Sequence, residues 1–447
     1  MRLVLPWIVF FQFMQSFNEN MFQIISPSIA DEFGITKATV SLVVTSSGLI
    51  VGIGAAVYAT LTDKFSMKQL FVFGIITLSI GSIFGFIMHD WFFTVVLGRV
   101  VQCIGSACIT GCYIIFITKY FPKKEQPKYI GFIPVMYQLS AGLGAAIGGM
   151  LAGYISWTFS YLLPIVTILA LPFFLKYLPD DRGQKDKQVD IVGAIWMTVC
   201  VSLLILSITF LNVYGIVISI LMFGYYTWRA NRHRYPFFNF SLLKIPRFKM
   251  TLTITVLVFG AHSCMMFMFP FVMKETYGLS TVEVGFLFVS STIPAIIAGI
   301  VVNRTIHRFG INKMFYMGCL LFISSSLLFA LFMGKSIYFA WFSFMLFTLS
   351  YPFIFTGFVS SVTRLLPKDK IGAGMGIYFL AVGCGRSIPV SIVGLMLTHH
   401  TFDQQIIPII SGDNDMYVYS NIYLLLAILL GVGWILFRLA HGKERRD

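Results

Sequence analysis

The sequence predicts an all-α integral membrane protein. Of its 447 residues, 57% are hydrophobic and only 11% are charged, whereas about a quarter of an average soluble domain is charged. A soluble protein of this composition would expose large apolar patches to water. Fourteen apolar runs, each near the about 20 residues that a helix needs to cross a bilayer, and the placement of the basic residues point to the same fold class.

The fourteen apolar runs predict fourteen transmembrane helices joined by mostly short loops. Their expected limits are 4–29, 39–61, 68–88, 92–117, 129–153, 156–177, 190–210, 212–229, 249–274, 280–302, 312–332, 336–362, 371–397 and 419–438. Longer polar segments are expected near 177–189, 229–248 and 398–418.

The basic residues set the expected orientation. If the N-terminus faces the cytoplasm, 27 of the 32 lysines and arginines fall in inward segments and 3 in outward loops. Arg99 and Arg386 lie within spans. This bias follows the positive-inside rule and predicts that both termini are cytoplasmic. The net charge of +14 is therefore explained by membrane topology, and no nucleic-acid partner is expected.

A weak internal sequence repeat suggests that the chain has two halves. The segments Ala59–Lys68 and Gly299–Gly310 both place a small residue four positions before Asp or Asn, which a cation follows directly. Repeated halves are typical of secondary transporters, with the substrate site between them. The expected domains are a six-helix bundle at 1–178, two inserted helices and a linker at 179–248, and a second six-helix bundle at 249–447.

Three charged residues are expected at membrane depth. At 1.5 Å per residue, Glu19 and Arg386 each lie roughly 22 Å from the cytoplasmic edge, and Arg99 lies roughly 10 Å from the outer edge. The three therefore share one level, and we expect Glu19 to pair with Arg99, because an unpaired charge there is costly. The pair either locks two helices together or exchanges for a proton during transport. His262 is the other titratable candidate, so proton coupling is predicted at Glu19, Arg99 and His262.

Polar side chains near this level are the candidates for a substrate cavity. The predicted set consists of Gln15, Asn18, Gln23, Gln102, Gln138 and Arg386.

Glycines and charged loop residues are the candidates for hinge and gating positions. The run Ser140–Gly149 is rich in small residues, which either pack helices closely or form a hinge. The predicted gating and hinge residues are Asp63, Lys64, Gly144, Gly148, Gly149, Asn303 and Arg304.

Three motifs resemble those of a known family. Ala59–Lys68 resembles G-x-L-x-D-[RK]-x-G-[RK]-[RK], Leu97–Gly105 resembles the motif built on Arg-x-x-Gln-Gly, and Gly144–Gly149 resembles G-P-x-x-G-G. Together they resemble the major facilitator superfamily, and more closely its 14-helix drug:proton antiporters. The tetracycline efflux proteins of Gram-positive bacteria (classes K and L) are the most similar branch, through Asn18-Glu19, Ala145–Met150, Gly372–Met375, Asp403–Pro408 and Tyr417–Asn421.

This resemblance implies a major facilitator fold with two six-helix halves and two central helices. It also implies proton-driven export of amphiphilic drugs, with tetracycline–divalent metal complexes as the type substrate. The protein itself is then expected to need no cofactor beyond the proton gradient, with any divalent metal bound to the substrate. A monomer in the bacterial cell membrane is expected, whose partners are protons, lipid and a small amphiphilic substrate.

The departures from the family pattern keep alternatives open. Ala145 replaces the motif proline, and Ala141, Arg386 and Asn303 stand where the family has acids, while Glu19 is retained. Loss of acids favours a broad drug range without tetracycline specificity, or an endogenous metabolite or lipid-like anion. A non-transporting membrane protein is a third alternative. An enzyme is not expected, because the sequence has no nucleotide-binding loop, metal-ligand cluster or nucleophile elbow.

Overall fold

The computed structural model describes residues 1–181, 190–233, 237–238, 240–365, 371–408 and 414–441, and these residues form helices joined by short loops. The first group is α1 (Leu5–Ile24), α2 (Ser26–Phe33), α3 (Lys37–Leu61), α4 (Met67–Ile87), α5 (Phe92–Tyr120), α6 (Gln126–Ile130), α7 (Phe132–Tyr154), the 3-10 helices η1 (Trp157–Tyr161) and η2 (Leu163–Ala170), and α8 (Leu171–Tyr177). The second is α9 (Ile191–Thr209), α10 (Val213–Arg232) and η3 (Phe240–Lys244). The third is α11 (Pro246–Tyr277), α12 (Thr281–Phe309), α13 (Ile311–Phe332), α14 (Ile337–Leu365), α15 (Ile371–Thr398) and α16 (Asn414–His441).

The predicted fold class is confirmed, since each of the fourteen expected segments is helical in the part of the chain that the structure describes. Twelve helical segments there are long and apolar enough to cross a membrane. The two remaining segments are the helices α1 and α10. Helix α1 carries a glutamate and several amides, and α10 ends in two arginines, so their composition is more polar.

Side-chain caps begin several helices at the short loops. The Ser66 hydroxyl oxygen accepts a hydrogen bond from the Gln69 backbone N–H, and the Gln69 side-chain oxygen accepts one from the Ser66 backbone N–H. These two bonds form a capping box at the start of α4. Thr36 and Asn212 cap α3 and α10 in a similar way. Gly34, with a φ of +60°, ends α2 in the left-handed region that favours glycine.

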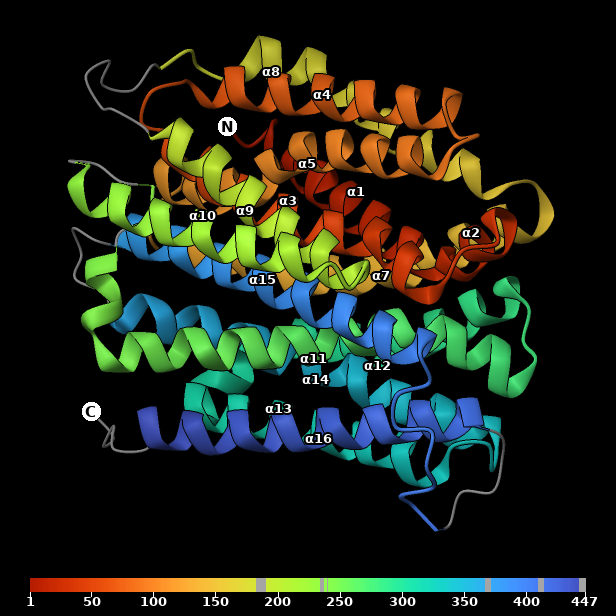
Figure 1. The fold of residues 1–447 in the computed structure, drawn as a ribbon. Coiled ribbons are helices and arrows are strands. Elements are labelled where there is room, and N and C mark those ends of the chain that lie inside the picture. Colours follow the sequence, from red (N-terminus) through yellow and green to blue (C-terminus); the bar gives the residue numbers. More distant parts are fainter. Residues whose placement is uncertain (182–189, 234–236, 239, 366–370, 409–413, 442–447) are drawn as a thin grey trace.

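The helices gather into two groups with an inserted pair beside them. In Figure 1 the N-terminal helices α1 to α8 form the upper part, α11 to α16 form the lower part, and α9 and α10 lie across the front. The two groups meet where α3 packs on α15 and α7 packs on α12, and α9 packs on both α3 and α15. The start of α1 and the end of α16 lie toward the same end of the bundle, opposite α2.

Glycines allow the two groups to approach closely. A Cβ atom at Gly52 of α3 would lie 2.5 Å from the Gly383 Cα of α15. A Cβ atom at Gly285 of α12 would lie 2.6 Å from the Ala145 carbonyl oxygen of α7. Backbone contact of this kind is common between membrane helices that carry small residues.

Candidate functional site

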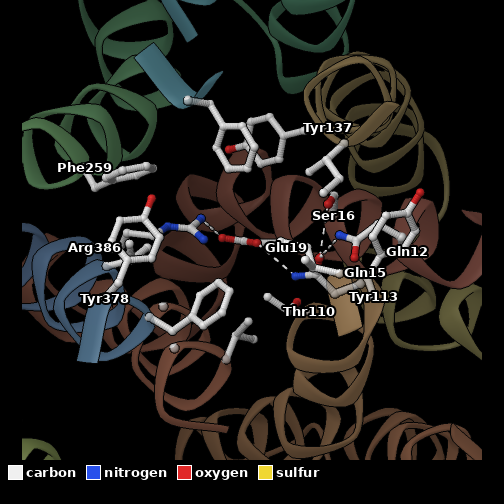
Figure 2. Close-up of a pocket in the computed structure, with 18 of the residues that line it drawn as sticks. Gln12, Gln15, Ser16, Glu19, Thr110, Tyr113, Tyr137, Phe259, Tyr378 and Arg386 are labelled. Carbon is white, nitrogen blue, oxygen red and sulfur yellow. Dashed lines mark hydrogen bonds and ion pairs between the residues drawn. The ribbon is translucent and has the colours of Figure 1, made fainter. Parts of the chain in front are cut away.

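A cavity of about 120 Å³ lies between the two groups of helices. Its walls come from α1, α3, α5 and α7 on one side and from α11, α14 and α15 on the other. Figure 2 shows Glu19 near its centre, with aromatic side chains around it. The cavity is therefore shared by both groups, which is where a transporter of two halves would hold its substrate.

Glu19 forms an ion pair with Arg386 across this cavity (Figure 2). The Gln15 side-chain amide donates to the other carboxylate oxygen of Glu19 at 3.2 Å. The Glu19 side chain is 6% exposed and that of Arg386 is 16% exposed, so both charges are largely removed from solvent. Glu19 belongs to α1 and Arg386 to α15, and the ion pair therefore joins the two groups of helices.

The predicted pair between Glu19 and Arg99 is wrong. The Arg99 guanidinium donates to the Gln102 side-chain oxygen at 2.8 Å and lies 3.9 Å from the centre of the Phe22 ring. The sequence predicts a similar depth for both arginines, but α15 presents Arg386 to the cavity face of α1, whereas α5 presents Arg99 to another face of α1.

Arg99 belongs to a separate buried polar cluster. The Asn18 side chain donates to the Gln102 oxygen at 3.4 Å, and the Gln102 amide donates to the Ser82 hydroxyl at 2.8 Å. Arg99 is 1% exposed, and its Nε atom has no hydrogen-bond partner among the described residues. The cation is thus held by an amide and an aromatic face, which stabilises a buried guanidinium less completely than a carboxylate would.

The other predicted cavity residues divide into two sets. Gln15 and Arg386 line the cavity, whereas the remaining amides are buried elsewhere and are not among its lining residues. These are Asn18, Gln23, Gln102 and Gln138. Gln138 donates to the backbone carbonyl of Thr348 and so ties α7 to α14.

His262 packs within an aromatic cluster behind the cavity wall. Its ring centre lies 4.9 Å from that of Phe347, 5.1 Å from Tyr351 and 6.2 Å from Tyr137. Tyr137 and Tyr351 stack at 4.4 Å and line the cavity, whereas His262 does not. The imidazole therefore contacts two residues of the cavity wall but is not itself part of the lining.

The predicted hinge glycines lie at close helix contacts. A Cβ atom at Gly144 would lie 2.6 Å from the Phe17 carbonyl oxygen of α1, and one at Gly149 would lie 2.5 Å from the Thr281 carbonyl oxygen. A Cβ atom at Gly148 would lie 2.7 Å from the Met21 side chain of α1. The structure thus shows tight packing of α7 on α1 and α12, and a hinge remains a prediction.

The predicted gating residues Asp63 and Lys64 are not among the residues that line the cavity. Asp63 and Lys64 follow the end of α3, and the Lys64 Nζ atom lies 5.9 Å from the centre of the Phe65 ring. The side chains of Asn303 and Arg304 lie outside the described residues, although both positions belong to the helix α12.

The aromatic lining of the cavity was not predicted residue by residue. It consists of Tyr113, Tyr137, Phe259, Tyr351, Phe355, Tyr378 and Phe379. Their only sequence signal is an aromatic content of 16%, which cannot separate the lining from ordinary packing.

Ion pairs close the end of the bundle that carries α2. Asp31 pairs with Lys274, and Lys37 pairs with Glu275 at 2.7 Å. The Tyr419 hydroxyl of α16 also donates to Glu275 at 2.7 Å. Since these contacts join α2 and α3 to α11 and α16, they hold the two groups together at this end.

No group of three or more His, Cys, Asp or Glu side chains in the described part of the chain is arranged to hold a metal ion. The site chemistry that the geometry supplies is a carboxylate and a guanidinium held in contact, set in an aromatic cavity.

Comparison with known proteins gives a consistent result. The family model of the Major Facilitator Superfamily matches residues 8–390. The "Putative multidrug resistance protein MdtD" of Yersinia pestis (strain Pestoides F) is 24% identical over 459 aligned positions, covering 96% of this chain and 94% of that protein. The same protein of Yersinia pseudotuberculosis (strain YPIII) matches equally well.

Solved structures share the fold at low identity. A point mutant of the nucleoside transporter NupG aligns with a TM-score of 0.67 and 12% identity, covering 98% of this chain and 100% of that one. The human organic anion transporter MFSD10 (TETRAN) aligns with a TM-score of 0.63 and 14% identity, covering 96% and 99%. A bacterial homologue of the human lysosomal transporter Spinster, inward-facing and unoccupied, aligns with a TM-score of 0.64 and 14% identity, covering 99% and 98%.

Proposed function

Because the chain belongs to the Major Facilitator Superfamily, a family of transporters and not of enzymes, we propose that it is a proton-coupled exporter of amphiphilic drugs. The observation that carries this proposal is the Glu19–Arg386 ion pair in the cavity between the two groups of helices. An ionisable carboxylate at membrane depth is costly and is a functional-site hypothesis in itself.

The ion pair offers a direct link between a proton and the conformation. When Glu19 binds a proton it loses its charge, and its attraction to Arg386 falls to that of a neutral hydrogen bond. The contact between α1 and α15 then weakens, while Gln15 still holds the carboxyl group. We propose that this step releases the two halves to rearrange, so that access to the cavity alternates between the two sides of the membrane.

The closed α2 end supports one assignment of conformation. The ion pairs of Asp31 and Lys37 join the halves at that end, so the cavity would open toward the opposite end, where α1 begins and α16 ends. With the termini in the cytoplasm, as the basic loops predict, this is an inward-facing or occluded state of a protein in the bacterial cell membrane. We expect a monomer.

The cavity favours an aromatic amphiphile. Its lining combines seven aromatic side chains with one paired carboxylate, so it offers stacking surfaces and little net charge. Tetracycline-like compounds are the first candidates, with any divalent metal bound to the drug rather than to the protein. At about 120 Å³ the cavity is smaller than the roughly 300–1,000 Å³ of drug-sized sites, so it must widen to bind such a compound.

A second candidate is an endogenous metabolite or lipid-like anion. Arg386 is the observation that favours it, because protonation of Glu19 would free the guanidinium for an anionic group. Broad multidrug export without tetracycline preference is compatible with the same aromatic walls and with the name of the Yersinia relative.

Drug susceptibility in an efflux-deficient host tests these proposals. Wild type and Glu19→Gln are compared across tetracyclines, quinolones, cationic dyes and fatty acids, with membrane expression measured for each. Resistance that Glu19→Gln abolishes supports proton-driven drug export. Unchanged resistance in Glu19→Gln removes Glu19 as the coupling residue. No resistance from well-expressed wild type refutes drug export, and transport of an anion that depends on Arg386 then supports the second candidate.

A further inference from the structure

A second cavity, of about 750 Å³, lies between α3, α4, α5 and α9. It shares no lining residue with the cavity at Glu19, because it faces the opposite side of α3. Gln69, Thr198 and Tyr58 are the only lining residues with polar side-chain atoms, and the rest are apolar. We call this cavity the α4–α9 groove.

Helix packing explains why this groove exists. Helix α9 packs on α3 and α15, while α4 packs on α5. Helix α3 therefore lies at the bottom of the groove, and α4 and α9 form its two sides. Large apolar side chains on the walls are exposed, with Phe73 at 55%, Ile195 at 59% and Val199 at 48%. All four helices are long and apolar enough to span a membrane. The groove therefore faces hydrocarbon, and an acyl chain is the occupant that the surroundings supply.

Basic residues stand at one end of the groove. Phe65 and Gln69 belong to its lining, and Lys64 and Lys68 directly precede them in the sequence. The Lys64 Nζ atom lies 5.9 Å from the centre of the Phe65 ring. Asp63, the residue before Lys64, also has an interaction partner in the structure. An apolar trough that ends beside two lysines matches a lipid chain that ends in a negatively charged headgroup.

We propose that the α4–α9 groove binds a phospholipid with an anionic headgroup. One acyl chain lies along α3 between α4 and α9, and the phosphate lies beside Lys64 and Lys68. Lipid tails are as apolar as the helices themselves, so the chain contributes packing but little selectivity. Preference among lipids must come from the two lysines. The bound lipid fills the space between the first helix group and the inserted pair α9–α10.

Native mass spectrometry of the full chain in detergent, titrated with phosphatidylglycerol or phosphatidylethanolamine, tests the proposal. Wild type is expected to retain phosphatidylglycerol preferentially. The double variant Lys64→Gln/Lys68→Gln should lower that preference roughly 25-fold, at about five-fold per cation. Its matched control is Lys123→Gln/Lys124→Gln, which removes the same charge from exposed positions outside the groove.

A second variant tests the acyl chain separately. Ile195→Trp fills the groove and should reduce retention of both lipids, whereas Ile220→Trp, at a position 62% exposed on α10 and outside the groove, should not. Monodisperse elution and an unchanged melting temperature in a lipid-free detergent show that each variant is folded.

Three results would overturn the proposal. One is equal phosphatidylglycerol retention in wild type and in the double lysine variant. Another is lipid retention that Ile195→Trp leaves unchanged. The third is displacement of lipid by the transported drug in wild type but not in Ile195→Trp, because the groove would then be a drug site and not a lipid site.

Discussion

Removing either member of the Glu19–Arg386 pair leaves the other charge buried without its counter-ion. Such a change costs about 3–5 kcal/mol when the partner cannot reach water. Glu19 is 6% exposed and Arg386 16% exposed, so little solvent is available to replace the lost contact. The Gln15 amide, at 3.2 Å, relieves part of the cost for Glu19. We therefore expect Arg386→Gln to lower the free energy of unfolding by about 3 kcal/mol, near the lower limit, and Glu19→Gln, in which Gln15 gives Arg386 no such relief, to lower it by about 3–5 kcal/mol.

The double variant Glu19→Gln/Arg386→Gln makes this expectation specific. It removes both charges at once and leaves two amides that can bond to each other, so it should recover most of the stability that each single variant loses. Thermal or denaturant unfolding of the four proteins in one detergent gives the coupling energy from a double-mutant cycle. Strictly additive losses would show that the two side chains are energetically independent, and would refute the reasoning.

Transport measured in the same four proteins separates stability from coupling. Reconstituted vesicles with an imposed pH gradient should show drug accumulation with wild type and none with the three variants, including the stable double variant. The Asp190–Arg229 ion pair, at 3.0 Å between α9 and α10, provides the matched control. Arg229→Gln should cost stability but leave accumulation dependent on the pH gradient. Gradient-driven accumulation by the double variant would exclude the pair from coupling.

Three further predictions follow from packing and charge. Gly144→Val should destabilise the protein by about 1–3 kcal/mol and impair transport, because its side chain would strike the Phe17 carbonyl oxygen; unchanged melting and uptake would contradict this. Glu275→Gln removes the negative charge that joins α3, α11 and α16, so spin-label distances between α2 and α11 should lengthen; an unaltered distance distribution would show that this charge does not hold the two groups together. Burial opposes the charged form of Asp190, but hydrogen bonds from Arg229 and from backbone amides outweigh it and hold its pKa below the ordinary 3.8. The charged carboxylate should therefore stabilise the fold above about pH 4, and this contribution should disappear as the pH falls further. The free energy of unfolding of Asp190→Asn should accordingly approach that of wild type only in strong acid.

The inserted helices show how a local signal and a tertiary contact combine. Asp190 directly precedes α9, and its carboxylate accepts from the Gly193 backbone amide of that helix at 2.9 Å. The same carboxylate accepts from Arg229 of α10 at 3.0 and 3.1 Å. The helix cap and the ion pair thus use the same side chain. The two partners of the cap are 3 residues apart in the sequence, whereas Arg229 is 39 residues from Asp190.

The sequence by itself determined the helical segments and their order, and it singled out Glu19 as a candidate, which the structure places in the cavity. Apolar runs of membrane length and one carboxylate among them are local properties, and the cost of apolar surface in water and of charge in lipid makes them readable without a structure. The three family motifs also pointed to the fold that the structure has.

Only the tertiary structure decided which arginine meets Glu19. The rise per residue predicts the depth of a side chain, but depth says nothing of which helices are neighbours or which faces they turn to each other. Arg99 and Arg386 were therefore equivalent in the sequence, until the packing of α15 on α3 brought Arg386 into the cavity. The aromatic walls and the α4–α9 groove were hidden for the same reason, because each is assembled from helices far apart in the chain.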